Sequence, residues 1–320
     1  MSTATLAPMF DNVIHQVAQD DTYHSMEGWS VSQWKLDSPE EIYGYHVAEP
    51  PLWPFTVTPA MQFGHKVHAR LLEPDTFSQR YPAAEPCCGI LKSGKRIGEQ
   101  CGSSASLRDP YGQWYCGTHA KGMASLEAVE CLDSDDAQRL NHIVRAVNAD
   151  PKVRWLINAP GAEEYALFGT HAETGLPVRG RLDKWIEHDG KRFIVDLKTI
   201  SCDPTNERLV AKQFAALSYE MQAAAYLDMM AAHGKPCDAF FHIVVKTSPP
   251  YTSCLWCLSD EEIALGRNRN RVALRDLAER LSTGRWTGAR HGEVNMLSYP
   301  KYAFGDVKPE PMEEFAAFAE

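Results

Sequence analysis

Residues 180–198 read Gly-Arg-Leu-Asp-Lys-Trp-Ile-Glu-His-Asp-Gly-Lys-Arg-Phe-Ile-Val-Asp-Leu-Lys, and this stretch decides the fold. Two runs rich in branched and aromatic side chains flank Asp189-Gly190, a dipeptide that is typical of a two-residue β-hairpin turn. Such a turn sets the register of the two strands and places Asp183 directly opposite Asp196, with their Cβ atoms roughly 5 Å apart. The register is the critical assumption, because a slip of one residue would turn Asp183 away from Asp196.

Two carboxylates that face each other are destabilising unless a positive charge lies between them. Lys198 follows Asp196 by two residues, so both side chains project from the same face of the strand. Phe193, Val195 and Leu197 occupy the other face and are expected in the core. Two acids and a lysine that converge on one sheet face indicate a divalent metal held for phosphodiester chemistry.

The composition bounds the class of protein. The chain has 320 residues, 44% hydrophobic and 23% charged, which suits one large globular domain or two smaller ones. No apolar run approaches the roughly 18 residues of a membrane span, and no secretory signal is visible. Nine cysteines without an export signal favour reduced thiols in a cytoplasmic protein, some of them binding metal. The net charge of −10 gives nucleic-acid binding no support, although a local basic channel and bound cations could act against an acidic exterior.

Residues 85–122 break this composition, because they are rich in Gly and Ser and offer little that could form a core. Their cysteines and one histidine favour a structural tetrahedral zinc site; the alternative is a loop with free thiols. The expected ligands are Cys88, Cys101, Cys116 and His119, with Cys87 as the rival of Cys88, since the sequence does not decide between the two neighbours. The basic residues of this insert could contact phosphates or only form a solvated face: Lys92, Lys95, Arg96 and Arg108.

Upstream of the insert, Thr58 as N-cap and Pro59 as first residue begin a helix that stops at Pro74. His65 and His68 share one face of this helix. A histidine in such a place is more often a packing or surface residue than a ligand.

Downstream of the insert, apolar spacing predicts a helical region from Ser125 to Trp155. A strand over residues 163–168 then turns near residues 173 and 174 into the hairpin, which would place Glu164 beside Asp183. A helix over 218–230, strands over 239–246 and 251–257, and a long basic helix from the capping box at Ser259 are expected to follow. The arginines of that last helix could touch a nucleic-acid backbone, although a solvated helix face explains them equally well.

Several motifs occur together in a fixed order along the chain. They are Thr58-Pro-Ala-Met-x-Phe-Gly64 with His68-x-x-Leu-Leu-Glu-Pro74, Gly180-Arg-Leu-Asp183, Asp196-Leu-Lys198-Thr199 and Tyr219-x-x-Gln222-Ala-Ala-x-Tyr226, with weaker matches at Tyr23-His24, Ser30-x-Ser32 and Arg285-Trp-x-Gly288. The set resembles the PD-(D/E)xK nuclease superfamily and, within it, the RecE-type exonucleases (exodeoxyribonuclease VIII) of phages and prophages, relatives of phage lambda exonuclease. The sequence departs from that pattern in the cysteine-rich insert, in His65 where a small residue is usual, and in Leu182 where proline is frequent.

The resemblance implies an α/β (α+β) fold with a restriction-endonuclease-like core, in which helices flank a mixed central sheet. Four parts are expected: residues 1–84 with the histidine motif, the zinc insert 85–122, the nuclease core 123–290, and a tail 291–320. The family's pattern implies Mg²⁺, with Mn²⁺ as a substitute, held by His68, Glu164 (with Glu163 as its rival), Asp183, Asp196 and the Leu197 carbonyl. The catalytic residues would be Asp183, Asp196 and Lys198, supported by Gln222 and Tyr226.

The activity implied by the resemblance is 5′→3′ digestion of linear double-stranded DNA. It would leave 3′ single strands for a partner annealing protein in DNA recombination, and a ring-like homo-oligomer, a trimer or tetramer, would act in the cytoplasm of a bacterium or phage host. Two alternatives remain open. One is a site-specific or structure-specific endonuclease on the same core, and the other is a non-catalytic, zinc-stabilised DNA- or protein-binding module.

Overall fold

A computed structural model describes residues 8–16, 23, 25–36, 38–288, 294 and 297. Two sequence predictions, His24 in the first weak motif and nearly all of the tail 291–320, lie outside these residues. In the part of the chain that the structure describes, no helix is both long and apolar enough to cross a membrane.

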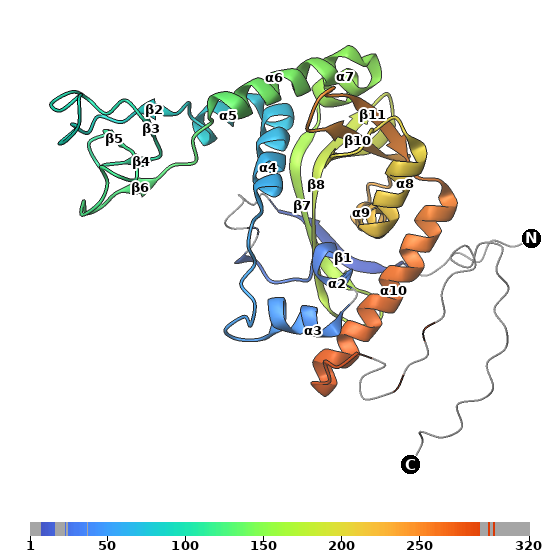
Figure 1. Cartoon of the computed structure of the whole chain (residues 1–320). Coiled ribbons are helices and arrows are strands. Elements are labelled where there is room, and N and C mark those ends of the chain that lie inside the picture. Colours follow the sequence, from blue (N-terminus) through green and yellow to red (C-terminus); the bar gives the residue numbers. More distant parts are fainter. Residues whose placement is uncertain are drawn as a thin grey trace, which may run out of the picture.

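The centre of the molecule is a six-stranded sheet with the order β1-β7-β8-β9-β10-β11 (Figure 1). All neighbours are antiparallel except β9 and β10, which are parallel, so the predicted mixed sheet is confirmed. The strands are β1 (Phe10–His15), β7 (Ala162–His171), β8 (Pro177–His188), β9 (Lys191–Ile200), β10 (Ala239–Lys246) and β11 (Ser253–Cys257).

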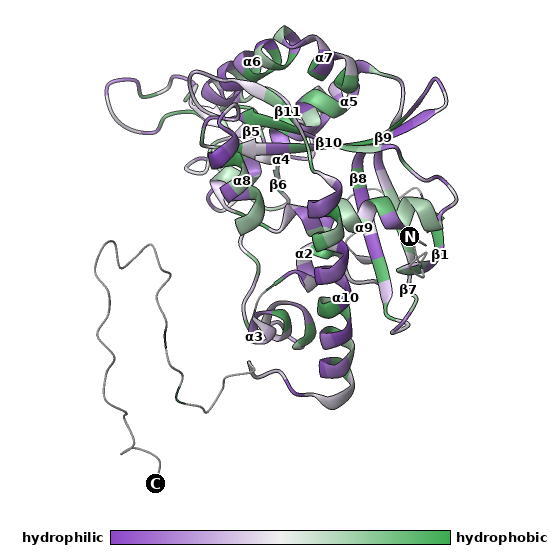
Figure 2. Cartoon of the chain, turned by 90° about the vertical axis from the view of Figure 1, so that its right-hand side faces the viewer, coloured by the Kyte–Doolittle hydropathy of each residue, from purple (hydrophilic) through white to green (hydrophobic). Residues whose placement is uncertain are grey.

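Helices cover both faces of this sheet. On one face, α4, α6 and α7 share a core with Ile186, Val195 and Leu197, against which Phe193 also packs. On the other face, α9 and α10 pack over Leu182 and Ile194, and Figure 2 shows both helices in front of the sheet. The bounds are α4 (Pro59–Leu72), α6 (Ser134–Ala149), α7 (Pro151–Asn158), α8 (Glu207–Ala216), α9 (Tyr219–Ala232) and α10 (Asp260–Thr283); the shorter elements are α2 (Val31–Trp34), α3 (Pro39–Ile42), a π-helix (Tyr43–Val47) and α5 (Pro74–Arg80).

The predicted hairpin is confirmed. Asp189 and Gly190 have φ values of 50° and 73°, which the two central residues of a type I′ turn require. The ladder runs from His188↔Lys191 to Lys184↔Val195, and continuing the same register by one step brings Asp183 opposite Asp196.

The strand before the hairpin also has the expected register. Pairs Glu163↔Lys184 and Tyr165↔Leu182 place Glu164 opposite Asp183. Glu164 has a φ of 48°, a left-handed conformation that is uncommon for any residue with a side chain. Leu182 packs on the α9 side but Ile186 on the α4 side, although residues an even number apart share a face of a regular strand. The side chains of β8 therefore exchange faces of the sheet between Leu182 and Ile186, in the segment where Asp183 lies opposite the irregular residue Glu164.

The helix α9 is buried on nearly all sides, because it lies between the sheet and α10. A Cβ atom at Gly266 of α10 would come within 2.1 Å of the Glu220 carbonyl oxygen, so only glycine allows the two helices this close approach. Four arginines of α10 form ion pairs within the chain: Arg267 with Asp228, Arg269 with Glu220, Arg275 with Glu173 and Arg280 with Asp276. These guanidinium groups are therefore already neutralised in the fold.

The prediction of a helical region from Ser125 to Trp155 is wrong at its start and in its continuity. Glu127–Ala128 forms strand β6, which pairs with β4 (Leu107–Arg108) of the insert. The helix α6 begins only after Asp133, whose side chain accepts a hydrogen bond from the Asp136 amide. Asp150 then caps a second helix with Pro151 at its first position, because proline cannot continue the helix before it.

Candidate active site

The acids of the hairpin lie in a largely buried setting. The side chain of Asp183 is 18% exposed and that of Asp196 is 3% exposed. Asp183 Oδ2 accepts a hydrogen bond of 2.7 Å from the Leu197 amide. The pairing of β8 with β9 ends at Lys184 and Val195, and beyond it the Asp183 carboxylate takes the place of a main-chain acceptor. This hydrogen bond holds Asp183 against β9, the strand that carries Asp196.

Lys198 lies in contact with both the second acid and the next helix. Its Nζ is 2.8 Å from Asp196 Oδ2, and it donates to Gln222 Oε1 on α9 at 2.8 Å. The same amine is 4.5 Å from the centre of the Tyr219 ring. Burial lowers the pKa of Lys198, but Asp196 and Tyr219 outweigh this and raise it above its ordinary value. The lysine is therefore held as an ammonium ion.

The two acids titrate very differently. Burial, followed by repulsion from Asp196, raises the pKa of Asp183 to about 7. Burial acts in the same direction on Asp196, but Lys198 and a hydrogen bond from His242 outweigh it and hold its pKa below the ordinary range. At neutral pH, Asp196 is ionised and Asp183 is near its midpoint, because the Lys198 ammonium lies against Asp196 and the two facing acids repel each other.

We expect Asp183→Asn to stabilise the protein at pH 8 in the absence of added divalent cations. The folded-state pKa of about 7 exceeds the ordinary value of roughly 4, so the wild type loses stability as pH rises from about 4 to 7 and the loss persists above pH 7. The asparagine can still accept the Leu197 amide and has no charge to bury. Urea unfolding should show a gain of roughly 1–3 kcal/mol at pH 8 and a smaller gain at pH 5. An equal or negative difference at both pH values would contradict this account.

His68 of α4 lies beside the acids, as predicted. Its Nδ1 is 3.5 Å from Asp183 Oδ2, and the ring forms a hydrogen bond with the main chain of Leu197. Burial, with a contribution from Lys198, lowers the pKa of His68, so the imidazole is neutral and able to bind a metal. His65, three residues earlier, is exposed.

Glu164, and not its neighbour Glu163, lies beside Asp183. Glu164 Oε2 is 2.7 Å from Arg181 Nε, and burial raises the pKa of its carboxyl to about 7 despite that arginine. Glu163 instead pairs with Lys184 at 3.0 Å. The structure thus brings four predicted acidic or histidine ligands into one region, although Glu164 is turned toward Arg181.

The two residues of α9 that the resemblance implies as supporting residues, Gln222 and Tyr226, lie beside the hairpin residues. Gln222 connects Lys198 to Tyr226, whose hydroxyl forms a hydrogen bond with the Gln222 side chain. A Cβ atom at position 180 would come within 2.7 Å of Tyr226 Cε1. This close packing explains why the motif begins with Gly180.

Two residues at this site were missed in the sequence. His242 lies beside Asp196 in the parallel register of β9 and β10, a pairing that no local signal predicts. Lys35 follows the serine motif, donates to the Leu217 carbonyl at 2.7 Å, and has a pKa lowered to about 8 by burial and by Lys198. The sequence offered one signal for His242 and Lys35. Each is a charged or imidazole side chain near an otherwise apolar segment.

The donors at this site fit a hard divalent cation. Carboxylate oxygens and a main-chain carbonyl suit Mg²⁺ or Mn²⁺, whereas a neutral imidazole is a ligand more usual for transition metals than for Mg²⁺. Burial, followed by repulsion from Asp196, raises the pKa of Asp183 to about 7, and a cation bound between the two carboxylates would favour its ionised form.

A second cluster lies in the insert, which projects away from the sheet (Figure 1). The ligand atoms of Cys87, Cys101, Cys116 and His119 all lie within 4.8 Å of one another, so the group could hold a metal ion. Hydrogen bonds from His119 lower the pKa of the Cys116 thiol to about 6, which favours the thiolate that metals bind. Short strands surround the cluster: β2 (Glu85–Pro86), β3 (Ser104–Ala105), β4 and β5 (Trp114–Tyr115).

The assignment of Cys88 to this cluster is wrong, and its rival Cys87 takes the place. Cys87 is fully buried, and its Sγ is 3.5 Å from His119 Nδ1 and accepts from the Gly89 amide at 3.4 Å. Cys88 is directed to the Tyr115 hydroxyl instead. Successive side chains of an extended segment point in opposite directions, so only one of the two cysteines can face the cluster.

The basic residues of the insert divide into two kinds. Arg96 pairs with Glu99 at 2.6 Å and Arg108 with Glu127 at 2.7 Å. Lys92 and Lys95 are exposed. The lysines are thus the insert's more available cations.

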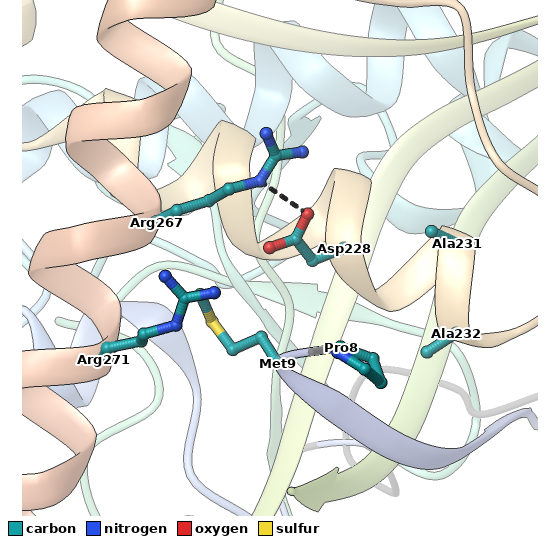
Figure 3. Close-up of a pocket in the computed structure, with 7 residues that line it drawn as sticks. All are labelled: Pro8, Met9, Asp228, Ala231, Ala232, Arg267 and Arg271. Atoms are coloured by element: carbon teal, nitrogen blue, oxygen red, sulfur yellow. Dashed lines mark hydrogen bonds and ion pairs between the residues drawn. The ribbon is translucent and has the colours of Figure 1, made fainter. Parts of the chain in front are cut away.

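A pocket of about 360 Å³ lies elsewhere, between α9, α10 and the start of β1 (Figure 3). Figure 3 shows Arg267 paired with Asp228 and Arg271 beside Met9. None of the acids of the hairpin lines it, so the chemistry described above does not take place in this pocket.

Comparison with known proteins gives a family. The model of a "PDDEXK-like domain of unknown function (DUF3799)" matches residues 30–297, and no curated protein matches. Among solved structures, a "Putative exonuclease" from Eubacterium rectale has a TM-score of 0.55 at 14% identity over 91% of this chain and 99% of that one, which shows a shared fold. SSO0001 (TM-score 0.27, 13% identity, 44% of this chain and 60% of that one) and protein VC1899 from Vibrio cholerae (TM-score 0.20, 11% identity, 85% and 58%) are too dissimilar for an argument. The chain therefore belongs to the PDDEXK-like family DUF3799, and its architecture is that of the PD-(D/E)xK nuclease superfamily.

Proposed function

We propose that this protein is a metal-dependent deoxyribonuclease that digests linear double-stranded DNA from its ends. The observation that carries the proposal is the complete constellation on the hairpin. Asp183 and Asp196 face each other, and Lys198 contacts both Asp196 and Gln222. The family match and the ordered motifs of RecE-type exonucleases support the same reading.

The residues have distinct roles in this proposal. Asp183, Asp196, the Leu197 carbonyl and His68 would hold one or two Mg²⁺ or Mn²⁺ ions, with Glu164 joining after release from Arg181. A divalent cation bound there lowers the pKa of a coordinated water and stabilises the charge of the leaving oxygen. Lys198, held as an ammonium, orients the attacking water and balances negative charge at the phosphate. Gln222, which Tyr226 supports, is the second partner of Lys198 and holds its ammonium beside Asp196 until DNA binds.

The finer features of the activity follow the resemblance to the RecE-type exonucleases. They are 5′→3′ polarity, 3′ single strands passed to an annealing protein in recombination, a ring-like trimer or tetramer through which DNA threads, and action in the cytoplasm of a bacterium or phage host. The structure from Eubacterium rectale that shares this fold is described as a "Putative exonuclease", which is consistent with dependence on a DNA end.

The experiment is an assay of linear duplex labelled at the 5′ or the 3′ end, with covalently closed circular DNA in parallel and Mg²⁺ present. We expect early release of the 5′ label as mononucleotide, slow release of the 3′ label, and intact circles. Nicked circles would favour a structure-specific or site-specific endonuclease on the same residues. Intact DNA in every reaction would reject a nuclease and favour a non-catalytic binding module.

We also propose that the metal of the insert is zinc. Three thiolates and one imidazole are the donor set of structural zinc sites. The insert has few buried side chains, among them Cys87, Ala105 and Ala120, so a metal would replace the hydrophobic core that this segment lacks.

A further inference from the structure

The carboxylate of Asp196 is held from two strands. In the parallel register of β9 and β10, His242 lies beside Asp196, and its Nδ1 is 3.2 Å from Asp196 Oδ2. Lys198 Nζ is 2.8 Å from the same oxygen. Oδ2 therefore accepts from two donors, whereas Oδ1 has Lys198 alone, at 3.0 Å, among the residues that the structure describes.

The His242 ring is fixed in its position by packing. The side chain has no exposed surface. The rings of Phe214 and Phe240 have their centres 4.9 and 4.8 Å from it, and Tyr219 stacks at 6.2 Å. Because protein interiors are close-packed, the imidazole cannot rotate away from Asp196 without moving this aromatic cage.

The protonation of the ring follows from its partners. An ionised carboxylate only accepts hydrogen bonds, so His242 Nδ1 must carry the proton. Nε2 is buried and has no hydrogen-bond partner within the described part of the chain, and a second proton there would be a buried, unsatisfied donor. His242 is thus a neutral ring that donates to Asp196 while its other nitrogen is left unpaired. An unsatisfied buried nitrogen is uncommon in native proteins and calls for an explanation.

We propose that His242 is a positioning residue for the metal-binding carboxylate of Asp196. Lys198 is shared between Asp196 and Gln222, and in the proposed nuclease its ammonium turns toward the attacking water or the scissile phosphate. When Lys198 turns, Asp196 loses that donor, and His242 is the one that continues to fix the carboxylate. The turning of Lys198 rests on the proposed function, but the bond between His242 and Asp196 does not.

The test compares the binding of Mn²⁺ to the wild type, His242→Leu and His242→Asn by calorimetry, without DNA. The asparagine amide can take the place of Nδ1 as donor, whereas leucine fills a similar volume and donates nothing. We expect His242→Leu to weaken Mn²⁺ affinity by roughly 10–100-fold, and His242→Asn to bind like the wild type. Wild-type affinity in the leucine variant would overturn the proposal. Equal losses in both variants at equal melting temperatures would also overturn it, because the ring and not the donor would then matter.

A second measurement needs no variant, so it applies even if the substitutions prevent folding. Nitrogen NMR of the protein labelled with ¹⁵N-histidine reads the tautomer of His242, assigned through its contacts with Phe240. We expect a protonated Nδ1 and a bare Nε2, and a proton on Nε2 would overturn the proposal. Failure of the two proposals can be told apart: Mn²⁺ binding without DNA cleavage contradicts the nuclease alone, whereas a wild type that binds no Mn²⁺ contradicts both.

Discussion

Asp196→Asn should lower the rate of DNA cleavage by on the order of 10³-fold or more. The asparagine keeps the shape of the side chain but removes the charge that would bind the cation and that pairs with Lys198 at 2.8 Å. It also leaves a buried ammonium without its counter-charge, so the melting temperature has to be measured beside the cleavage rate at saturating Mg²⁺.

The matched control is Asp189→Asn, the same substitution in the same hairpin. Asp189 lies in the turn with a φ of 50° and an exposed side chain, and asparagine tolerates this left-handed conformation as well as aspartate does. We expect cleavage within experimental error of the wild type. Full activity in Asp196→Asn would remove the hairpin acids from the mechanism, and equal losses in both variants would point to damage of the hairpin and not of its chemistry.

The parts of the site that could be predicted are those set by local sequence. The Asp189-Gly190 turn fixes the register of β8 and β9, because a two-residue loop leaves no freedom in pairing. The longer turn near residue 174 allowed more freedom, yet the pairs around Glu164 are those expected from it. The capped helix α4, with Thr58 accepting from the Met61 amide at 3.3 Å, is likewise a local feature.

The features that escaped prediction depend on contacts between distant segments. His242 faces Asp196 because β10 pairs in parallel with β9, and the connection between them contains two helices. Such a crossover does not fix register through its own sequence. Lys35 lies near enough to Lys198 for its pKa to be lowered by it, because α2 packs against α9, a contact that sequence periodicity does not reveal.

Two other predictions were wrong. One took periodic apolar residues after Ser125 for a helix, and the other chose Cys88 and not its neighbour Cys87 as a ligand. The apolar spacing after Ser125 matched a helix, but Glu127–Ala128 pairs with a strand of the insert, so tertiary pairing overrode a local pattern. Cys87 and Cys88 are equivalent as donors, and only the direction of the chain just after β2 decides which one faces His119.

That last distinction gives the sharpest test of the insert. Purified wild type should contain about one zinc per chain, Cys88→Ser should retain it, and Cys87→Ser should lose it. Both substitutions exchange sulfur for oxygen at neighbouring positions, so they differ in whether the side chain belongs to the cluster.

Structural zinc contributes about 10–16 kcal/mol of binding free energy in small domains, which is far more than the few buried side chains of this insert could replace. Without the metal, residues 85–122 should therefore unfold locally while the sheet and its two cores persist. Trypsin reads this directly, because Lys92 and Lys95 lie in the insert, and cleavage there should become at least about tenfold faster in Cys87→Ser than in Cys88→Ser. Zinc retained by Cys87→Ser, or lost equally by both variants, would contradict the cluster that the structure shows.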